Sequence, residues 1–101
     1  MNNKEFNKIL DNRLESIQSV LGSKAKEYAH GGDRLHNFKV AATINNTTPE
    51  KALWGMATKH LVSVMDLVNG NLAPTPEMIN EKIGDLCNYL ILLEAILLDN
   101  K

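Results

Sequence analysis

The fold of this chain is decided by the stretch EKIGDLCNYLILLEAILL, which spans residues 81–98. Its first turns carry ionisable and polar side chains, whereas from Leu90 onward only Glu94 interrupts the apolar residues. Unbranched apolar side chains lose little rotamer freedom in a helix, so the stretch predicts a helix with one polar turn and an apolar body. The apolar part is too short to cross a bilayer, which takes about 20 residues.

Two segments upstream also carry helical periodicity. Apolar residues recur at steps of three and four between Lys4 and Tyr28, which predicts an amphipathic helix with a bend or break at Gly22-Ser23. A second, short helix is expected to run to about Ile44, with Asp33 as its N-cap.

Two Thr-Pro-Glu triplets, at residues 48–50 and 75–77, predict sharp helix starts. Threonine caps a helix, proline suits its first position, and glutamate favours the positive helix end. The expected apolar face of the third helix comprises Leu53, Ala57, Leu61, Val64 and Val68. That of the fourth comprises Ile79, Ile83, Leu86, Leu90, Leu93 and Leu97. The sequence therefore predicts an all-α fold, a single-domain bundle of three long helices and one short helix over residues 1–101.

The end of the fourth helix exceeds what one chain can cover. Between Leu90 and Leu98, apolar side chains point all round the helix, and a helix that is apolar all round is buried all round. Because so small a bundle covers only part of it, we expect a homo-oligomer.

Charge and cysteine content exclude several classes of function. Eleven basic and twelve acidic residues give a net charge of −1 without any block of like charges, so we expect no nucleic-acid polymer as partner. The single cysteine, Cys87, excludes an intrachain disulfide and a cysteine-rich zinc site. Residues 1–5 are polar and no apolar run follows them, so we expect no secretory signal, no membrane partner and a cytoplasmic location.

The polar turn of the fourth helix holds the clearest candidate site. Glu81, Asp85 and Asn88 are spaced i, i+4 and i+7 and share one face. Two carboxylates one turn apart can hold a hard cation such as Mg²⁺. In the alternative interpretation, Glu81 favours the first turns of the helix and Asp85 pairs with Lys82 or another cation at the surface.

Further candidates lie on the third helix and in the loop segment before the second. On the third helix, Lys59 offers a cation for phosphate, His60 a titratable imidazole, and Asp66 a carboxylate for metal or sugar. The alternative is a surface pair beside a hydrogen-bonded, half-buried histidine. The segment of residues 27–39 adds a dense set of polar groups that includes Asp33 and Asn37.

The run EKIGDLCNYL, residues 81–90, resembles the metal-binding helix of the MazG-like all-α nucleoside triphosphate pyrophosphohydrolases. The wider pattern is similar to the nucleotide-modification-associated domains of phages and bacteria near that superfamily. The segments that carry the resemblance are residues 26–28, 33–38, 59–66 and 81–89.

The resemblance implies an oligomeric helical fold, a nucleotide ligand and Mg²⁺-dependent hydrolysis to a monophosphate and pyrophosphate. It places the chain in the cytoplasm, that of the host if a phage encodes it. On this hypothesis Glu81 and Asp85 bind the metal, and Asp66 and His60 are catalytic. The residues expected to bind substrate are Lys59, Lys82, Asn37, Asp33 and Asn88.

Two departures from the family pattern weaken the catalytic interpretation. Lys82 stands where the family has a glutamate, three residues before Asp85. Glu27 lacks the second carboxylate of the Glu-x-x-Glu pair that the family carries on an earlier helix. A lysine repels a metal ion but can bind phosphate. The alternative is therefore a non-catalytic, oligomeric module that binds a nucleotide or a protein.

Overall fold

The computed structural model describes residues 1–22, 32–70 and 73–100. Within these ranges the chain forms four helices and no strand, as the sequence predicts. The helices are α1 (Asn3–Leu21), α2 (His36–Ile44), α3 (Pro49–Val68) and α4 (Pro76–Asp99). None of the helices in this part of the chain combines the length and apolarity that crossing a bilayer requires.

The starts of α3 and α4 confirm the two Thr-Pro signals. The Thr48 side chain accepts a hydrogen bond from the Lys51 amide at 3.4 Å, and that of Thr75 accepts one from the Met78 amide at 3.1 Å. Each threonine satisfies an amide that the first helical turn leaves without a backbone partner, and each following proline lacks such an amide.

The first helix ends where its glycine predicts a break. The helix α1 stops at Leu21, and Gly22 leaves the helical conformation with ψ −116° while its amide still bonds to the Gln18 carbonyl at 2.8 Å. The predicted continuation to Tyr28 lies outside the described residues. At the other end, the Asn2 side chain and the Glu5 amide form a capping box that the sequence analysis missed.

The predicted N-cap of α2 is wrong by two residues. The helix begins at His36 with Leu35 at the cap position and no side-chain cap. The Asp33 carboxylate accepts from the Leu35 amide at 2.9 Å, so this aspartate stabilises a turn that precedes the helix. After α2 the chain turns, and Asn46 takes a left-handed φ of 53° there.

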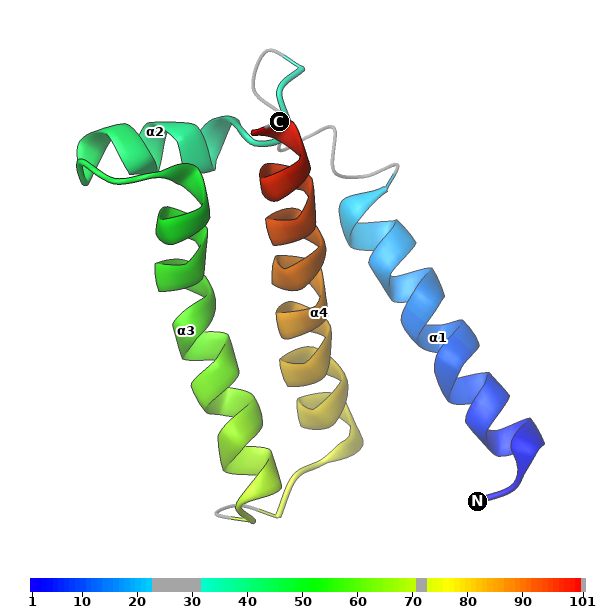
Figure 1. The fold of residues 1–101 in the computed structure, drawn as a ribbon. Coiled ribbons are helices and arrows are strands. Elements are labelled where there is room, and N and C mark those ends of the chain that lie inside the picture. Colours follow the sequence, from blue (N-terminus) through cyan, green and yellow to red (C-terminus); the bar gives the residue numbers. More distant parts are fainter. Residues whose placement is uncertain (23–31, 71–72, 101) are drawn as a thin grey trace.

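The core lies where α2 crosses the end of the antiparallel α3–α4 pair (Figure 1). Tyr89, Leu92 and Leu93 pack partly buried against it. Its buried members are Leu35, Phe38, Leu53, Ala57 and Ile96.

The apolar faces predicted for the last two helices need correction. Ile79, Leu90 and Leu97 of α4 are 44–50% exposed, because the face around Ile96 is the one that meets α3. The predicted stripe of α3 holds at Leu53 and fails at its end, where Val68 is 80% exposed.

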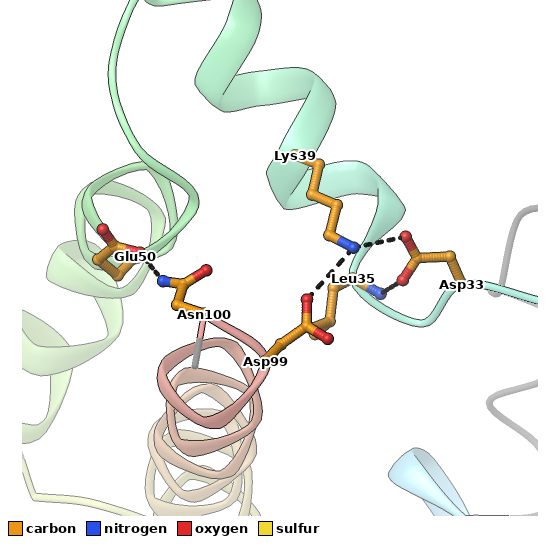
Figure 2. A network of polar contacts seen from close by, with 6 residues as sticks. All are labelled: Asp33, Leu35, Lys39, Glu50, Asp99 and Asn100. Atoms are coloured by element: carbon orange, nitrogen blue, oxygen red, sulfur yellow. Dashed lines mark hydrogen bonds and ion pairs between the residues drawn. The ribbon is translucent and has the colours of Figure 1, made fainter.

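A polar network closes the same end of the molecule (Figure 2). The Lys39 ammonium lies 2.9 Å from the Asp33 carboxylate and 3.3 Å from that of Asp99, which joins α2 to the end of α4. The Asn100 amide donates to the Glu50 carboxylate at 2.7 Å and joins α4 to the start of α3.

Helix α1 stands apart from this unit. Among the described helices it contacts α4 alone, and it lies on the side of α4 remote from α3 (Figure 1). No residue of α1 is buried. Its half-buried positions before the last turn are three polar residues and one apolar one, namely Arg13, Ser16, Ser19 and Ile17.

Candidate functional site

A polar cavity of about 480 Å³ lies between α1 and α4. This volume falls within the range of about 300–1,000 Å³ that is usual for small-molecule sites. Its lining residues come from both helices: Asn12, Arg13, Glu15, Ser16, Ser19, Val20, Asn80, Glu81, Gly84, Asp85 and Asn88.

The wall from α4 consists of the three residues that the sequence places on one face. Glu81, Asp85 and Asn88 all line the cavity. Glu81 is exposed, whereas Asp85 and Asn88 are half-buried. The shared face is a prediction from helical spacing, and the cavity brings the three oxygen-bearing side chains to one space.

The wall from α1 was missed by the sequence analysis. Asn12, Glu15, Ser16 and Ser19 line the cavity at i, i+3, i+4 and i+7, the spacing of a single helix face. That polar periodicity was readable beside the apolar stripe of the same helix.

Arg13 ties the two walls together. Its guanidinium donates to the Asn80 carbonyl at 3.0 Å and to the Asn80 side-chain oxygen at 2.9 Å. A Cβ at Gly84 would lie 2.5 Å from Arg13 Nη1, so the glycine leaves the room that the guanidinium occupies. The cavity therefore carries a fixed positive charge along with the carboxylates of Glu15, Glu81 and Asp85.

His60 approaches the site from α3. Its Nδ1 lies 3.6 Å from an Asp85 carboxylate oxygen, and its ring stacks on Tyr89 with centroids 4.9 Å apart. The imidazole side chain is 20% exposed. The distance to Asp85 is that of an ion pair when the imidazole is protonated, and the Tyr89 ring holds the imidazole plane in place.

Asn88 has an unsatisfied atom beside the cavity. Its side-chain oxygen is buried and has no hydrogen-bond donor among the described residues. An unpaired buried acceptor costs about 1–3 kcal/mol, so this oxygen favours a ligand that brings an N–H, an O–H or a cation. Asn88 is the polar group of the site with the clearest need for a partner.

Two of the predicted substrate-binding residues lie at the other end of the molecule. Asp33 pairs with Lys39, which also pairs with Asp99. Fourteen residues separate Asp85 from Asp99, which is about 21 Å along a helix. The Lys39 ammonium and the Leu35 amide hold the pKa of Asp33 below its ordinary value. Asn37 is exposed in the first turn of α2, so the structure brings neither Asp33 nor Asn37 to the cavity.

The other predicted residues do not line the cavity. Lys59 is exposed on α3, and Asp66 is half-buried nearly two turns further along that helix than His60. Lys82 is half-buried on α4 next to Glu81 and points to a different side of the helix, since successive residues are about 100° apart. The positive charge at the cavity wall comes from Arg13 instead.

The carboxylates of Glu81 and Asp85 could hold a metal ion whose remaining coordination positions are filled by a bound ligand. Where residues are described, no group of three or more histidine, cysteine, aspartate and glutamate side chains is placed to hold an ion. Glu81, Asp85 and Asn88 nevertheless all line the cavity. Mg²⁺ commonly uses one or two carboxylates and fills its remaining positions with water and substrate phosphates.

No family model, curated protein sequence or solved structure matches this chain. The MazG-like resemblance therefore remains a prediction from the residues quoted above.

Proposed function

We propose that the α1–α4 cavity binds a nucleotide together with Mg²⁺. The observation that carries the proposal is that two α4 carboxylate residues, Arg13 and Asn88 line one cavity of about 480 Å³, and that the buried Asn88 oxygen is unpaired. A nucleotide presents the complementary groups, since it has anionic phosphates together with N–H and O–H donors on its base and sugar.

Each wall has a part in this proposal. Arg13 binds phosphate oxygens, and the Ser16 and Ser19 hydroxyls donate to the same groups. The Asn88 oxygen accepts from a base amino group or a sugar hydroxyl. Mg²⁺ held by Glu81 and Asp85 would neutralise charge on the phosphates. Arg13 replaces Lys59 and Lys82 as the expected phosphate contact, because it lines the cavity and they do not.

The catalytic form of the proposal is hydrolysis of a deoxynucleoside triphosphate to a monophosphate and pyrophosphate. Water attacks a phosphorus, the bond to the pyrophosphate oxygen breaks, and the proton of the water must be accepted. Asp85 lies on the cavity wall, and its carboxylate is 3.6 Å from the imidazole of His60. Either group of this pair can accept the proton of the attacking water.

The test compares two charge-neutral variants of the same helix. Asp85→Asn removes a cavity carboxylate, whereas Glu94→Gln makes the same change at an exposed position outside the cavity. With a panel of deoxynucleoside triphosphates and Mg²⁺ or Mn²⁺, we expect thermal stabilisation and pyrophosphate release by the wild type and by Glu94→Gln. Asp85→Asn should reduce the thermal stabilisation and the rate of pyrophosphate release, each by a factor of about 10 or more. Equal behaviour of the two variants, or no response of the wild type, would overturn the proposal.

A second candidate is nucleotide binding without catalysis. The observation that favours it is the charge of the cavity wall, where Arg13 provides a permanent cation and no three-ligand group of metal-binding side chains lies among the described residues. Thermal unfolding with nucleotide in the presence of EDTA distinguishes the catalytic function from binding alone. Stabilisation by about 2.7 kcal/mol at 100 times Kd, unchanged by the chelator and without pyrophosphate release, would establish this second function.

A further inference from the structure

Helix α1 turns most of its apolar side to solvent. The residues of this surface, which we term the α1 stripe, are Phe6, Ile9, Leu10, Leu14 and Val20. Their exposed fractions run from 45% to 57%. An isolated exposed leucine needs no explanation, but five large apolar side chains along one side of a helix form a contiguous patch of the kind that marks an interaction site.

A second exposed apolar surface lies on the C-terminal half of α4. Leu90, Ile91, Leu97 and Leu98 are 39–62% exposed and border a shallow groove of about 490 Å³. Leu90, Ile91 and Leu98 lie more than 100° around the helix from Ile96, the residue buried against α3. This α4 surface therefore faces away from the core of its own chain.

The total exposed area shows how much surface lacks cover. The chain exposes 7429 Å². A folded monomer of 11.2 kDa exposes about 5,700 Å² by the scaling of area with mass. The excess is about 1,700 Å² per chain, so two chains that covered it would bury about 3,400 Å² in total, which lies within the range of about 2,000–5,000 Å² for obligate homodimers.

We propose that the α1 stripe packs against the α1 stripe of a second copy of this chain, with the apolar surface of α4 at the edge of the interface. The excess area matches what a stable dimer needs, and a two-fold axis pairs one surface with itself. The charge on α1 argues against an anionic membrane, because three basic residues are offset by three acidic ones. A net charge of −1 per chain gives two copies little repulsion.

The dimer would also fix one wall of the cavity. Among the described residues, two arginines hold α1 by hydrogen bonds in the single chain. Arg13 bonds to Asn80 on α4, and Arg34 donates to the carbonyl of Leu21 at the end of α1. A second copy adds apolar contacts to stripe residues such as Phe6, Ile9 and Leu14, which these bonds leave exposed. The dimer does not depend on the nucleotide proposal, since it follows from exposed surface alone.

The first test is the mass of the full chain in solution. Sedimentation equilibrium of the wild type at 10–100 µM should give twice 11.2 kDa, or a higher even multiple. Leu10→Asp combined with Leu14→Asp should give single chains, while Ile44→Asp, a change at a 77% exposed residue of α2, should keep the wild-type mass. A wild type that sediments as a single chain or an odd multiple would overturn the proposal.

A cross-linking test needs no disruptive substitution. In a Cys87→Ser background, Leu14→Cys places a thiol near the middle of the α1 stripe, and Ile44→Cys places one at the remote end of α2 (Figure 1). Ile44 is 77% exposed against 52% for Leu14, so random collision favours disulfides at residue 44. Docked α1 helices instead favour residue 14 by about tenfold or more, because they raise the effective thiol concentration. Equal or faster cross-linking at residue 44 would contradict the pairing.

Discussion

Helices α3 and α1 are of nearly equal length and both are amphipathic, yet they meet their surroundings in opposite ways. Helix α3 buries Leu53 and Ala57 to 0% and 2% exposure. Helix α1 buries no residue, and its half-buried turns are mainly polar. Periodicity thus specifies that a helix has an apolar face, but the neighbouring elements decide whether that face is covered.

The difference has a topological cause. Helix α3 is followed directly by α4 and preceded directly by α2, so short connections bring a partner to each end of it. Helix α1 is separated from α2 by residues 22–35 and, among the described helices, contacts α4 alone. In one chain the α2–α3–α4 unit has a core, whereas α1 borders a polar cavity and leaves its apolar stripe exposed to solvent.

The sharpest way to break this comparison is to remove the centre of the core. Leu53→Ala should lower the free energy of unfolding by about 2–5 kcal/mol, because the side chain is fully buried and a cavity remains. Val68→Ala on the same helix, at an 80% exposed position, should change it by less than about 0.5 kcal/mol. Urea denaturation followed by circular dichroism measures both. Equal effects would mean that the α3–α4 contact is misassigned.

The second prediction sharpens the contrast at α1. If a second copy covers the α1 stripe, Leu14→Ala should cost about 1.5–3 kcal/mol at 100 µM chain, the value of a buried leucine. At concentrations low enough to separate the chains, the cost should fall below about 0.5 kcal/mol. Thermal unfolding at a series of concentrations gives the answer. A cost that does not change with concentration would mean that α1 is covered within its own chain.

Much of the fold could be predicted because its signals are local. The Thr-Pro starts at Thr48 and Thr75 depend only on the next three residues, and the break at Gly22 depends on the glycine itself. The common face of Glu81 and Asp85 follows from helical spacing. These features need no knowledge of which helix packs against which.

The missed features all depend on tertiary neighbours. Asp33 was predicted to bind substrate beside the metal site, although Lys39, which also pairs with Asp99, holds it at the far end of α4. Arg13 and Glu15 were not predicted, because their place at the cavity depends on α4 lying beside α1. A helix has two faces, and the spacing of its residues does not say which of them meets the next helix.

A third prediction compares the caps of the two regions. Thr75→Ala removes the side chain that accepts from the Met78 amide and should destabilise the protein by about 1 kcal/mol, since α4 unfolds together with the core. Asn2→Ala removes the capping box of α1. In dilute single chains it should cause local fraying with no change in the global midpoint, because the first turns of α1 are exposed. Hydrogen exchange of the two first turns separates local from global opening. A global shift from Asn2→Ala in single chains would place α1 within the cooperative unit.

The smallest expected effect is the pH dependence of the polar network at the end of the core. The pKa of Asp33 is lowered by the Lys39 ammonium and the Leu35 amide, so its contribution is present above its ordinary value of about 3.8 and is lost as pH falls through the lower folded value. The pKa of Lys39 is raised by Asp33 and Asp99, so its contribution is present below about 10.5 and is lost as pH rises through the higher folded value. The melting temperature of Asp33→Asn should therefore lie slightly below that of the wild type from pH 5 to 9 and meet it in strong acid.

This effect must be small because the two side chains are 45% and 41% exposed, and water and salt screen such pairs. Adding 0.5 M NaCl at pH 7 should shrink the difference between Asp33→Asn and the wild type, while the difference for Leu53→Ala should stay. The assignment of stability to the apolar core would be reversed by either of two results. The melting temperature of Leu53→Ala could fall below the wild type by an amount that depends on salt, or that of Asp33→Asn by a large amount that does not. The polar network would then carry the stability that the structure places in the apolar core between α2, α3 and α4.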